Sequence, residues 1–205
     1  MAAEHQPIVT IFEQYGAGGS EVAERLAGRL GVPFLHQAVS SEDLEEAEAE
    51  ARAGENAFER FLRAFSPLPT ADADITWALE EQYTHEIVLD NTRRVLDAVD
   101  QTGGVLVGRN ATVILADAPL SLHVKLIGPV EARVARAAHE SGIDLATARR
   151  RQEREDRVRA EMSRHLYQWD PTTDQAYDLV VDTGAFTIDQ TVDLIEHAFR
   201  LKYPA

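Results

Sequence analysis

The chain has 205 residues, of which 44% are hydrophobic and 27% charged, and its net charge is −15. This size and composition fit a single globular domain over residues 1–205, and the acidic charge argues against general nucleic-acid binding. The absence of cysteine excludes disulfides, thiolate metal sites and cysteine nucleophiles. No secretory signal opens the chain and no apolar run approaches the ~20 residues that span a bilayer, so we expect a cytoplasmic protein without a membrane partner.

The first predicted element is a buried strand in the apolar run of residues 8–12. Glycines follow within residues 16–19, and Ser20 opens a predicted helix that ends at Gly31. This order is typical of a phosphate-binding loop, because glycine lets backbone N–H groups approach an anion and the helix start adds partial positive charge. The pattern GxxxxGK[ST] is incomplete, since Glu13 stands at its first glycine and Gly19 at its lysine. A phosphate loop without lysine and an ordinary strand-to-helix turn are both open here.

Four further apolar runs alternate with helical patterns along the rest of the chain. The runs predict strands over residues 32–36, 105–107, 120–127 and 177–183. Helices are predicted over 75–100, from Pro129 to Gly142, from an Asp144 cap onward, and after Gly184. Short apolar strands separated by helices predict an α/β fold with a five-stranded parallel sheet covered on both faces. The acidic segment 40–64 is interpreted as a solvated helix face within a long helical insert.

Arginine is concentrated in the helix that begins after Asp144. Seven of the twenty basic residues fall within sixteen positions there, and the spacing of Arg150, Arg154 and Arg157 places them on one face. The helix is either an exposed element laced with salt bridges or a lid that clamps phosphates with guanidinium groups. The seven are Arg149, Arg150, Arg151, Arg154, Arg157, Arg159 and Arg164.

Polar residues follow two other predicted strands. Arg109 and Asn110 come directly after the strand at 105–107, where open α/β sheets bind ligands, so they are candidates for recognising a base or a phosphate. A structural arginine in an ion pair is the alternative for Arg109. The run 182–184 is interpreted as ordinary turn chemistry at a strand end, and Trp169 as the aromatic anchor of a turn.

Together these motifs resemble the cytidylate kinase-like family, a branch of the P-loop nucleoside monophosphate kinases. The resemblance is carried, in order, by the loop region 9–23, the run 105–111, the segment 124–136, the pair Asp156-Arg157 and the strand region 177–183. It covers nearly the whole chain and is weakest over residues 37–73.

The resemblance implies a P-loop core, a helical nucleoside-monophosphate-binding flap and an arginine-rich lid. The core would comprise residues 1–36, 101–138 and 168–205, with the flap over 37–100 and the lid over 139–167. It also implies ATP as phosphoryl donor, Mg²⁺ as cofactor, and a small nucleotide, CMP or dCMP, as acceptor.

The same resemblance implies roles for individual residues. Acceptor binding falls to Arg109, Asn110 and Asp156, and Ser20 is the metal-side ligand. The phosphate-binding residues would be Gly16, Ala17, Gly18, Gly19, Ser20 and Glu21. The catalytic residues would be Arg109, Arg150, Arg154 and Arg157.

The chain departs from the family pattern at several positions, which leaves three functions open. The branch usually has Ser-Arg where Phe12-Glu13 stands and an aspartate where His36 stands. True cytidylate kinases have a lysine in place of Gly19 and an acid in place of Val107. A carboxylate at position 13 would repel donor phosphates. An active kinase, a nucleotide-binding or regulatory protein without turnover, and a kinase for another small acceptor are therefore all open, as is the oligomeric state.

Overall fold

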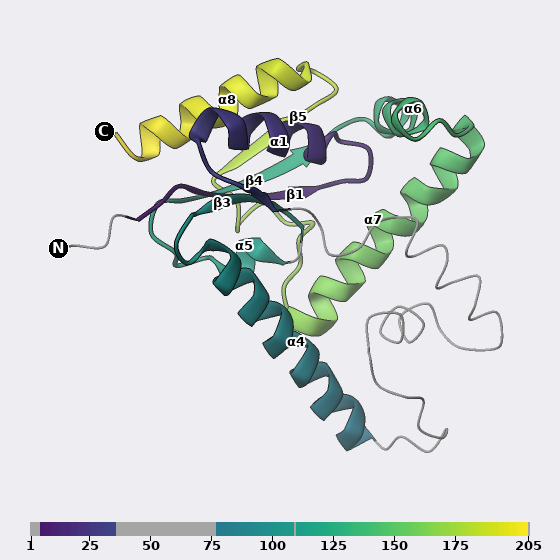
Figure 1. The fold of residues 1–205 in the computed structure, drawn as a ribbon. Coiled ribbons are helices and arrows are strands. Elements are labelled where there is room, and N and C mark those ends of the chain that lie inside the picture. Colours follow the sequence, from purple (N-terminus) through teal and green to yellow (C-terminus); the bar gives the residue numbers. More distant parts are fainter. Residues whose placement is uncertain (1–4, 36–76, 109, 205) are drawn as a thin grey trace.

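The computed structural model of the chain describes residues 5–35, 77–108 and 110–204. The predicted α/β class is confirmed, because the strands of these residues form one parallel sheet in the order β2-β3-β1-β4-β5 (Figure 1). The strands are β1 (Ile8–Glu13), β2 (Phe34–Leu35), β3 (Gly104–Val107), β4 (Ser121–Ile127) and β5 (Leu179–Asp182). The helices are α1 (Gly19–Leu30), α4 (Trp77–Val99), α5 (Ala111–Ile114), α6 (Val130–Ser141), α7 (Leu145–Tyr167) and α8 (Ile188–Lys202).

The central strand β1 pairs with β3 on one side and β4 on the other. Val9 lies in register with Val105 of β3 and with Leu122 of β4. All three side chains are buried on the same face, where they pack under α1 and α8. Residues of these strands are buried on both faces, which is why their sequence reads as continuous apolar runs rather than an alternation.

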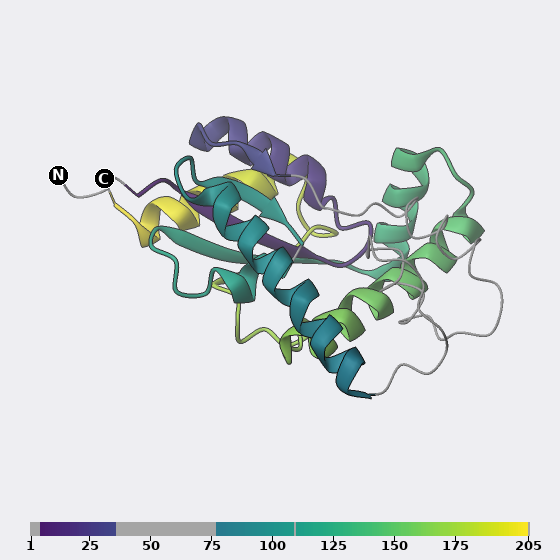
Figure 2. The same ribbon diagram turned by 60° about the horizontal axis from the view of Figure 1, so that its bottom comes forward.

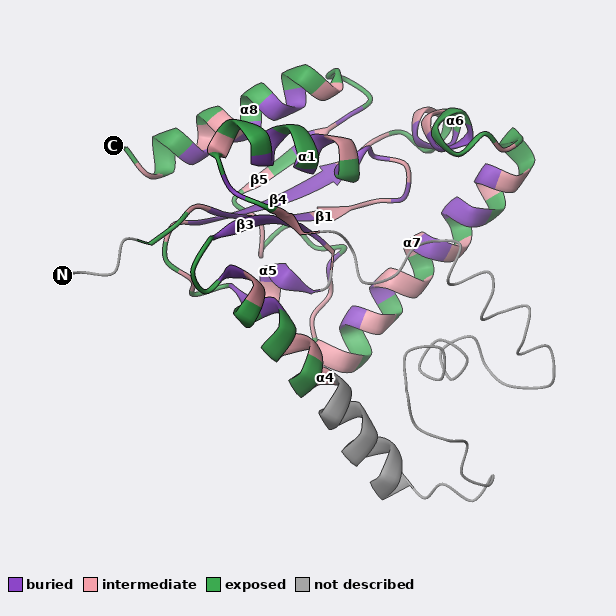
Figure 3. Ribbon diagram, viewed as in Figure 1, coloured by how far each residue is buried: buried purple, intermediate pink, exposed green. Residues whose placement is uncertain are grey.

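Helices cover both faces of the sheet, as predicted. On the face of α1 and α8, Leu26 and Ile195 are fully buried in the larger core. Figure 3 shows buried residues along β3 and β4. On the opposite face, Val95 of α4 packs with Leu106 of β3 and Leu115 in a smaller core. Figure 2 shows α1 and α8 on one side of the strands and α4 on the other.

The second face also buries a series of polar side chains that contact one another between β1, α5 and β4. The Thr10 hydroxyl lies 3.1 Å from the Thr112 hydroxyl and 2.8 Å from Nδ1 of His123, and the Ser121 hydroxyl lies 3.4 Å from Nε2 of the same imidazole. Burial lowers the pKa of His123, with Asp178 opposing this shift by attraction. Burial therefore favours the neutral form of the ring.

Several element ends agree with the sequence patterns and others differ slightly. The Asp144 carboxylate accepts a hydrogen bond from the Thr147 N–H and caps α7, and Gly31 ends α1 in the left-handed conformation, as predicted. Helix α1 starts at Gly19 rather than Ser20, because Gly18 is its left-handed cap. The second and fifth strands are shorter than predicted. The segment 37–73, most of the expected insert, lies outside the described residues.

Helices α6 and α7 form a pair that extends from the carboxyl edge of the sheet. Val134 and Ala138 of α6 pack with Ala148 of α7 in a small separate core. At the far end of α7, the Tyr167 hydroxyl accepts a hydrogen bond of 2.6 Å from Nδ2 of Asn91 on α4, so the two long helices converge there (Figure 1). Among the described helices, none has the length and apolar character needed to span a membrane.

Candidate active site

The glycine loop joins the carboxyl end of β1 to the start of α1. Gly16 and Gly18 have φ angles of 76° and 82°, which side chains rarely adopt. The Ala17 N–H donates to the Gln14 carbonyl at 2.9 Å and closes the turn. The first N–H groups of α1 have no intrahelical acceptor and carry the positive end of the helix dipole. The loop thus presents amide donors at the sheet edge where α/β proteins bind ligands.

One of these amides is already occupied by a carboxylate of the same chain. Oε2 of Glu13 accepts a hydrogen bond of 2.6 Å from the Gly19 N–H. A Cβ atom on Gly19 would lie 2.6 Å from the same oxygen, so the carboxylate fills the space where a side chain at position 19 would begin. The Glu13 side chain is only 11% exposed. The two departures from the phosphate-loop pattern are therefore in direct contact.

A cluster of alternating charges connects Glu13 to α7. Nη1 of Arg159 lies 3.3 Å from the Glu13 carbonyl oxygen, to which it donates, and 3.7 Å from Oε1 of the carboxylate. Nη2 of Arg159 donates to Glu155 at 3.0 Å, and Arg154 lies 3.7 Å from the other oxygen of Glu155. Glu155 is fully buried, so this part of α7 faces inward and is not an exposed salt-bridge surface.

Asp156 holds α7 against the loop. Its Oδ1 accepts a hydrogen bond of 2.8 Å from the Tyr15 N–H, and its Oδ2 accepts from Arg133 at 3.0 Å and from Gln152 at 2.8 Å. The Arg133 guanidinium is 3% exposed and also donates to the Tyr15 carbonyl at 2.8 Å. Asp156 therefore has a positional role at the loop, beside the predicted acceptor contact, which stays a prediction.

Arg136 of α6 lies over the other side of the loop. Nη1 donates to the Gly16 carbonyl at 2.9 Å and to the Thr183 hydroxyl at 3.0 Å, while Nη2 donates to the Thr183 carbonyl at 2.7 Å. Thr183 follows β5, so the predicted strand-end turn joins the loop through this arginine. Gly16 approaches α6 so closely that a Cβ atom there would lie 2.3 Å from the Arg133 carbonyl oxygen.

The remaining predicted arginines have different surroundings. Arg154 is largely buried, whereas Arg150 and Arg157 are exposed, and Arg150 donates to the Thr147 hydroxyl at 2.8 Å. The three thus do not share one environment. Arg109 lies outside the described residues.

The predicted acceptor residue Asn110 is buried at the carboxyl end of β3 and adopts a left-handed φ of 55°. Its Oδ1 accepts a hydrogen bond of 2.6 Å from the hydroxyl of Ser163 on α7. The run after β3 is therefore brought to the same helix as the glycine loop.

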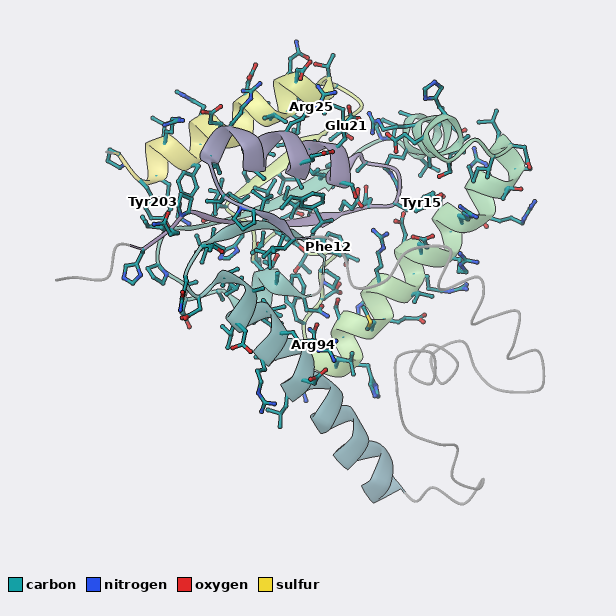
Figure 4. The ribbon with its side chains drawn as sticks, in the orientation of Figure 1. Phe12, Tyr15, Glu21, Arg25, Arg94 and Tyr203 are labelled. Atoms are coloured by element: carbon teal, nitrogen blue, oxygen red, sulfur yellow. The ribbon has the colours of Figure 1, made fainter. Side chains whose placement is uncertain are left out.

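Acidic residues surround the mouth of the loop on α1 and α6. Glu21 forms an ion pair with Arg25, and both lie on α1, away from Tyr15 at the other end of the loop (Figure 4). Burial raises the pKa of Glu140; attraction by Arg136 opposes this shift, and Glu21 and Glu13 add to it by repulsion. Glu13, Glu21 and Glu140 therefore add negative charge beside the loop, and Arg136 opposes it.

A metal site made of protein ligands alone is absent from the part of the chain that the structure describes. No group of three or more histidine or acidic side chains there has the arrangement to hold a metal ion. Ser20 at the start of α1 is exposed. A hydroxyl at this position fits Mg²⁺ only together with water and phosphate oxygens, which is how this ion binds in kinases.

The aromatic anchor predicted at Trp169 packs against the strand that leads into the loop. Its ring meets that of Phe12 edge-on at 6.4 Å, and Tyr177 completes the cluster. The buried Lys125 amine lies 5.4 Å from the Tyr177 ring centre and donates to the Thr172 carbonyl at 2.6 Å. Phe12 therefore has a packing role, and Glu13 is the first residue whose side chain reaches the loop.

By its fold and its glycine loop, this chain is of the P-loop α/β class. A shikimate kinase structure from Acinetobacter baumannii matches 100% of this chain and 98% of its own with a TM-score of 0.50 at 16% identity, a likeness of fold. The chain belongs to the cytidylate kinase-like family, whose sequence model matches residues 8–185. The predicted resemblance is confirmed.

Two curated relatives differ in how they align. A cytidylate kinase from Methanopyrus kandleri is 27% identical over 199 residues, which cover 93% of this chain and 92% of the relative. A uronate isomerase from Corynebacterium glutamicum is 41% identical over 150 residues, which cover 73% of this chain but 29% of the relative. The chain thus spans less than a third of that second protein.

Proposed function

We propose that the chain transfers a phosphoryl group from ATP to a small nucleotide, with CMP or dCMP as acceptor. The observation that carries this proposal is the glycine loop at the carboxyl end of β1, with arginines of α6 and α7 directed onto it. Family membership supports phosphotransfer to a small substrate. The Methanopyrus relative supports a cytidine nucleotide as the acceptor.

In this reaction the chain would act by positioning and by balancing charge. Backbone N–H groups from Gly16 to Ser20 would bind the donor phosphates, and arginines would neutralise charge that spreads over the transferred group. Ser20 would hold Mg²⁺, which when bound contributes further neutralisation. An acceptor phosphate is already an anionic nucleophile at neutral pH, so no general base is required.

The family arrangement also suggests roles for the two segments outside the predicted core. We propose residues 37–100 as the acceptor flap and 139–167 as the lid around the core, with Arg109, Asn110 and Asp156 directed to the acceptor and Arg150, Arg154 and Arg157 to the transferred group. The net charge of −15 disfavours nucleic acid as a partner, so we propose small nucleotides as the partners, in the cytoplasm.

The direct test is release of ADP from ATP and Mg²⁺ with each common nucleoside monophosphate in turn. We expect turnover with CMP or dCMP above that with other monophosphates, and its loss in Ser20→Ala. Ser141→Ala, at an exposed position near the end of α6, is the matched control and should keep wild-type turnover. No turnover above buffer with any monophosphate would refute this function.

A sugar acid is the second candidate acceptor, supported by the Corynebacterium relative named as a uronate isomerase. Arginine forks bind carboxylates as well as phosphates, so arginines near the loop, such as Arg159, would suit either acceptor. A uronate accepts through a hydroxyl, which needs a base to remove its proton. ADP release with glucuronate or galacturonate, but not with CMP, would select this candidate over the first.

A nucleotide-binding protein without turnover is the third candidate, supported by Glu13 on the Gly19 amide. It predicts that calorimetric titration detects ATP while ADP release stays at the level of buffer for nucleotides and uronates. Turnover with any acceptor would refute it.

A further inference from the structure

The phosphate-loop pattern places a positive charge at position 19, where this chain has glycine. Arg159 on α7 reaches the carboxylate of Glu13, which contacts this position. Its Nη1 is 3.7 Å from Oε1 of Glu13, whose Oε2 accepts the Gly19 N–H at 2.6 Å. One carboxylate therefore bridges a guanidinium and an amide at a helix start.

Two oxygens of one phosphate would make the same two contacts. Amides at helix N-termini and arginine forks are the usual donors to phosphate in proteins. The Glu13 carboxylate thus occupies an anion position of the loop. Gly19 makes this possible, because a Cβ atom there would lie 2.6 Å from the carboxylate oxygen.

Arg159 does not depend on the Glu13 side chain for its position, because Nη1 also donates to the Glu13 backbone carbonyl at 3.3 Å. Its Nη2 donates to Glu155 at 3.0 Å, one helical turn earlier on α7, and Glu155 is fully buried. If the Glu13 side chain turned away, this pairing would keep the Arg159 guanidinium at the loop. Glu155 is therefore a positioning residue for Arg159.

We infer that Arg159 is the cation of this phosphate loop and that Glu13 is an internal anion which a donor phosphate displaces. The inference rests on the proposed use of the loop for a phosphate donor. In the free protein the Gly19 N–H donates to the Glu13 carboxylate, and Arg159 forms an ion pair with the same carboxylate. In the bound protein the same donors contact phosphate and the Glu13 side chain points away.

The test measures binding of inorganic tripolyphosphate and, separately, of ATP by isothermal titration calorimetry. Tripolyphosphate contacts only the phosphate site, so its affinity does not depend on the acceptor or on turnover. Glu13→Gln removes the charge at nearly constant shape and should tighten binding of both ligands by about tenfold. Arg159→Gln should weaken binding by about tenfold, and Arg159→Lys should weaken it less.

Arg164→Gln is the matched control, because Arg164 lies on the same helix, is exposed, and pairs with Asp170 away from the loop. It should bind tripolyphosphate as the wild type does. Unchanged affinity in Glu13→Gln, with or without a change in thermal midpoint, would show that Glu13 is only a structural partner and would overturn the inference. Equal affinities of Arg159→Gln and Arg164→Gln would also overturn it.

The outcome separates this inference from the proposed function. Affinities that change as expected in a protein without turnover would refute the proposed kinase and support the inference. Turnover with CMP together with unchanged affinities would support the proposed kinase and refute the inference.

Discussion

The carboxylate of Asp156 accepts a hydrogen bond from the backbone N–H of Tyr15, 141 residues earlier in the chain. The same carboxylate pairs with Arg133, which is almost fully buried. Three separate elements, the glycine loop, α6 and α7, are therefore joined at one side chain. The position of α7 over the loop depends on this contact.

Asp156→Ala should lower the free energy of unfolding by about 2–3 kcal/mol, because it leaves the buried Arg133 guanidinium without its counter-ion. Asp156→Asn keeps an acceptor for Tyr15 and should cost less. Urea unfolding measures both. Glu153→Ala, exposed on the same helix, is the control and should change stability by less than about 0.5 kcal/mol. Equal stabilities of Asp156→Ala and this control would contradict the assignment.

Gly16→Ala should be much more destabilising than Gly142→Ala. Both glycines have positive φ, so alanine costs about 1–2 kcal/mol of backbone strain at either position. Only at Gly16 does the added Cβ meet backbone, 2.3 Å from the Arg133 carbonyl oxygen, whereas at Gly142 nothing lies within 4 Å. The difference between the thermal midpoints of the two variants measures the cost of the close approach between Gly16 and α6. Similar losses in both would show that α6 moves away without cost.

Gly19→Ala and Glu13→Ala should not be additive. In the wild type a Cβ atom at position 19 displaces the Glu13 carboxylate and breaks its hydrogen bond to the Gly19 N–H. Without Glu13 the same alanine gains helix propensity. A double-mutant cycle in urea should give a coupling energy of about 1 kcal/mol. A coupling near zero would show that the carboxylate leaves the amide in solution.

Stability should fall as the pH decreases below about 6.5, the ordinary pKa of histidine, because of His123. Burial lowers the pKa of His123 in the folded protein, so in this range the unfolded chain takes up a proton that the folded chain does not. Since the unfolded state binds more protons, the free energy of unfolding rises with pH there. Urea midpoints between pH 5 and 7.5 should show this slope, with a smaller slope in His123→Gln. His197→Gln, exposed on α8, should retain the wild-type slope, and an identical slope in His123→Gln would exclude His123 as its source.

Much of the fold could be predicted from local sequence patterns. Apolar runs such as residues 120–127 marked strands because a parallel sheet buried on both faces requires them. The Asp144 cap and the left-handed glycines at 31 and 142 marked helix ends because only a few residue types satisfy those positions. The start of α1 was misplaced by one residue because Gly18 takes the cap position through its backbone alone.

The residues that make up the site were harder to predict from the sequence. Arg133 and Arg136 stood within the family motif, but nothing in their spacing distinguished a loop contact from a surface pair. Arg159 carried one local signal, its spacing of one helical turn from Glu155, which is common on any charged helix. Its contact with Glu13 depends on how α7 approaches the sheet edge, which no local pattern encodes.

By itself the sequence determined the α/β class, the family, and the glycine loop between β1 and α1, because these follow from periodicity, glycine placement and motif order. Only the tertiary structure decided what the loop contains. Glu13 and Arg159 are 146 positions apart in the chain. The contact between their side chains is therefore set by tertiary packing and not by local sequence. They meet because Asp156 and Arg133 hold α7 against the loop, and that packing brings a carboxylate, an amide and a guanidinium together.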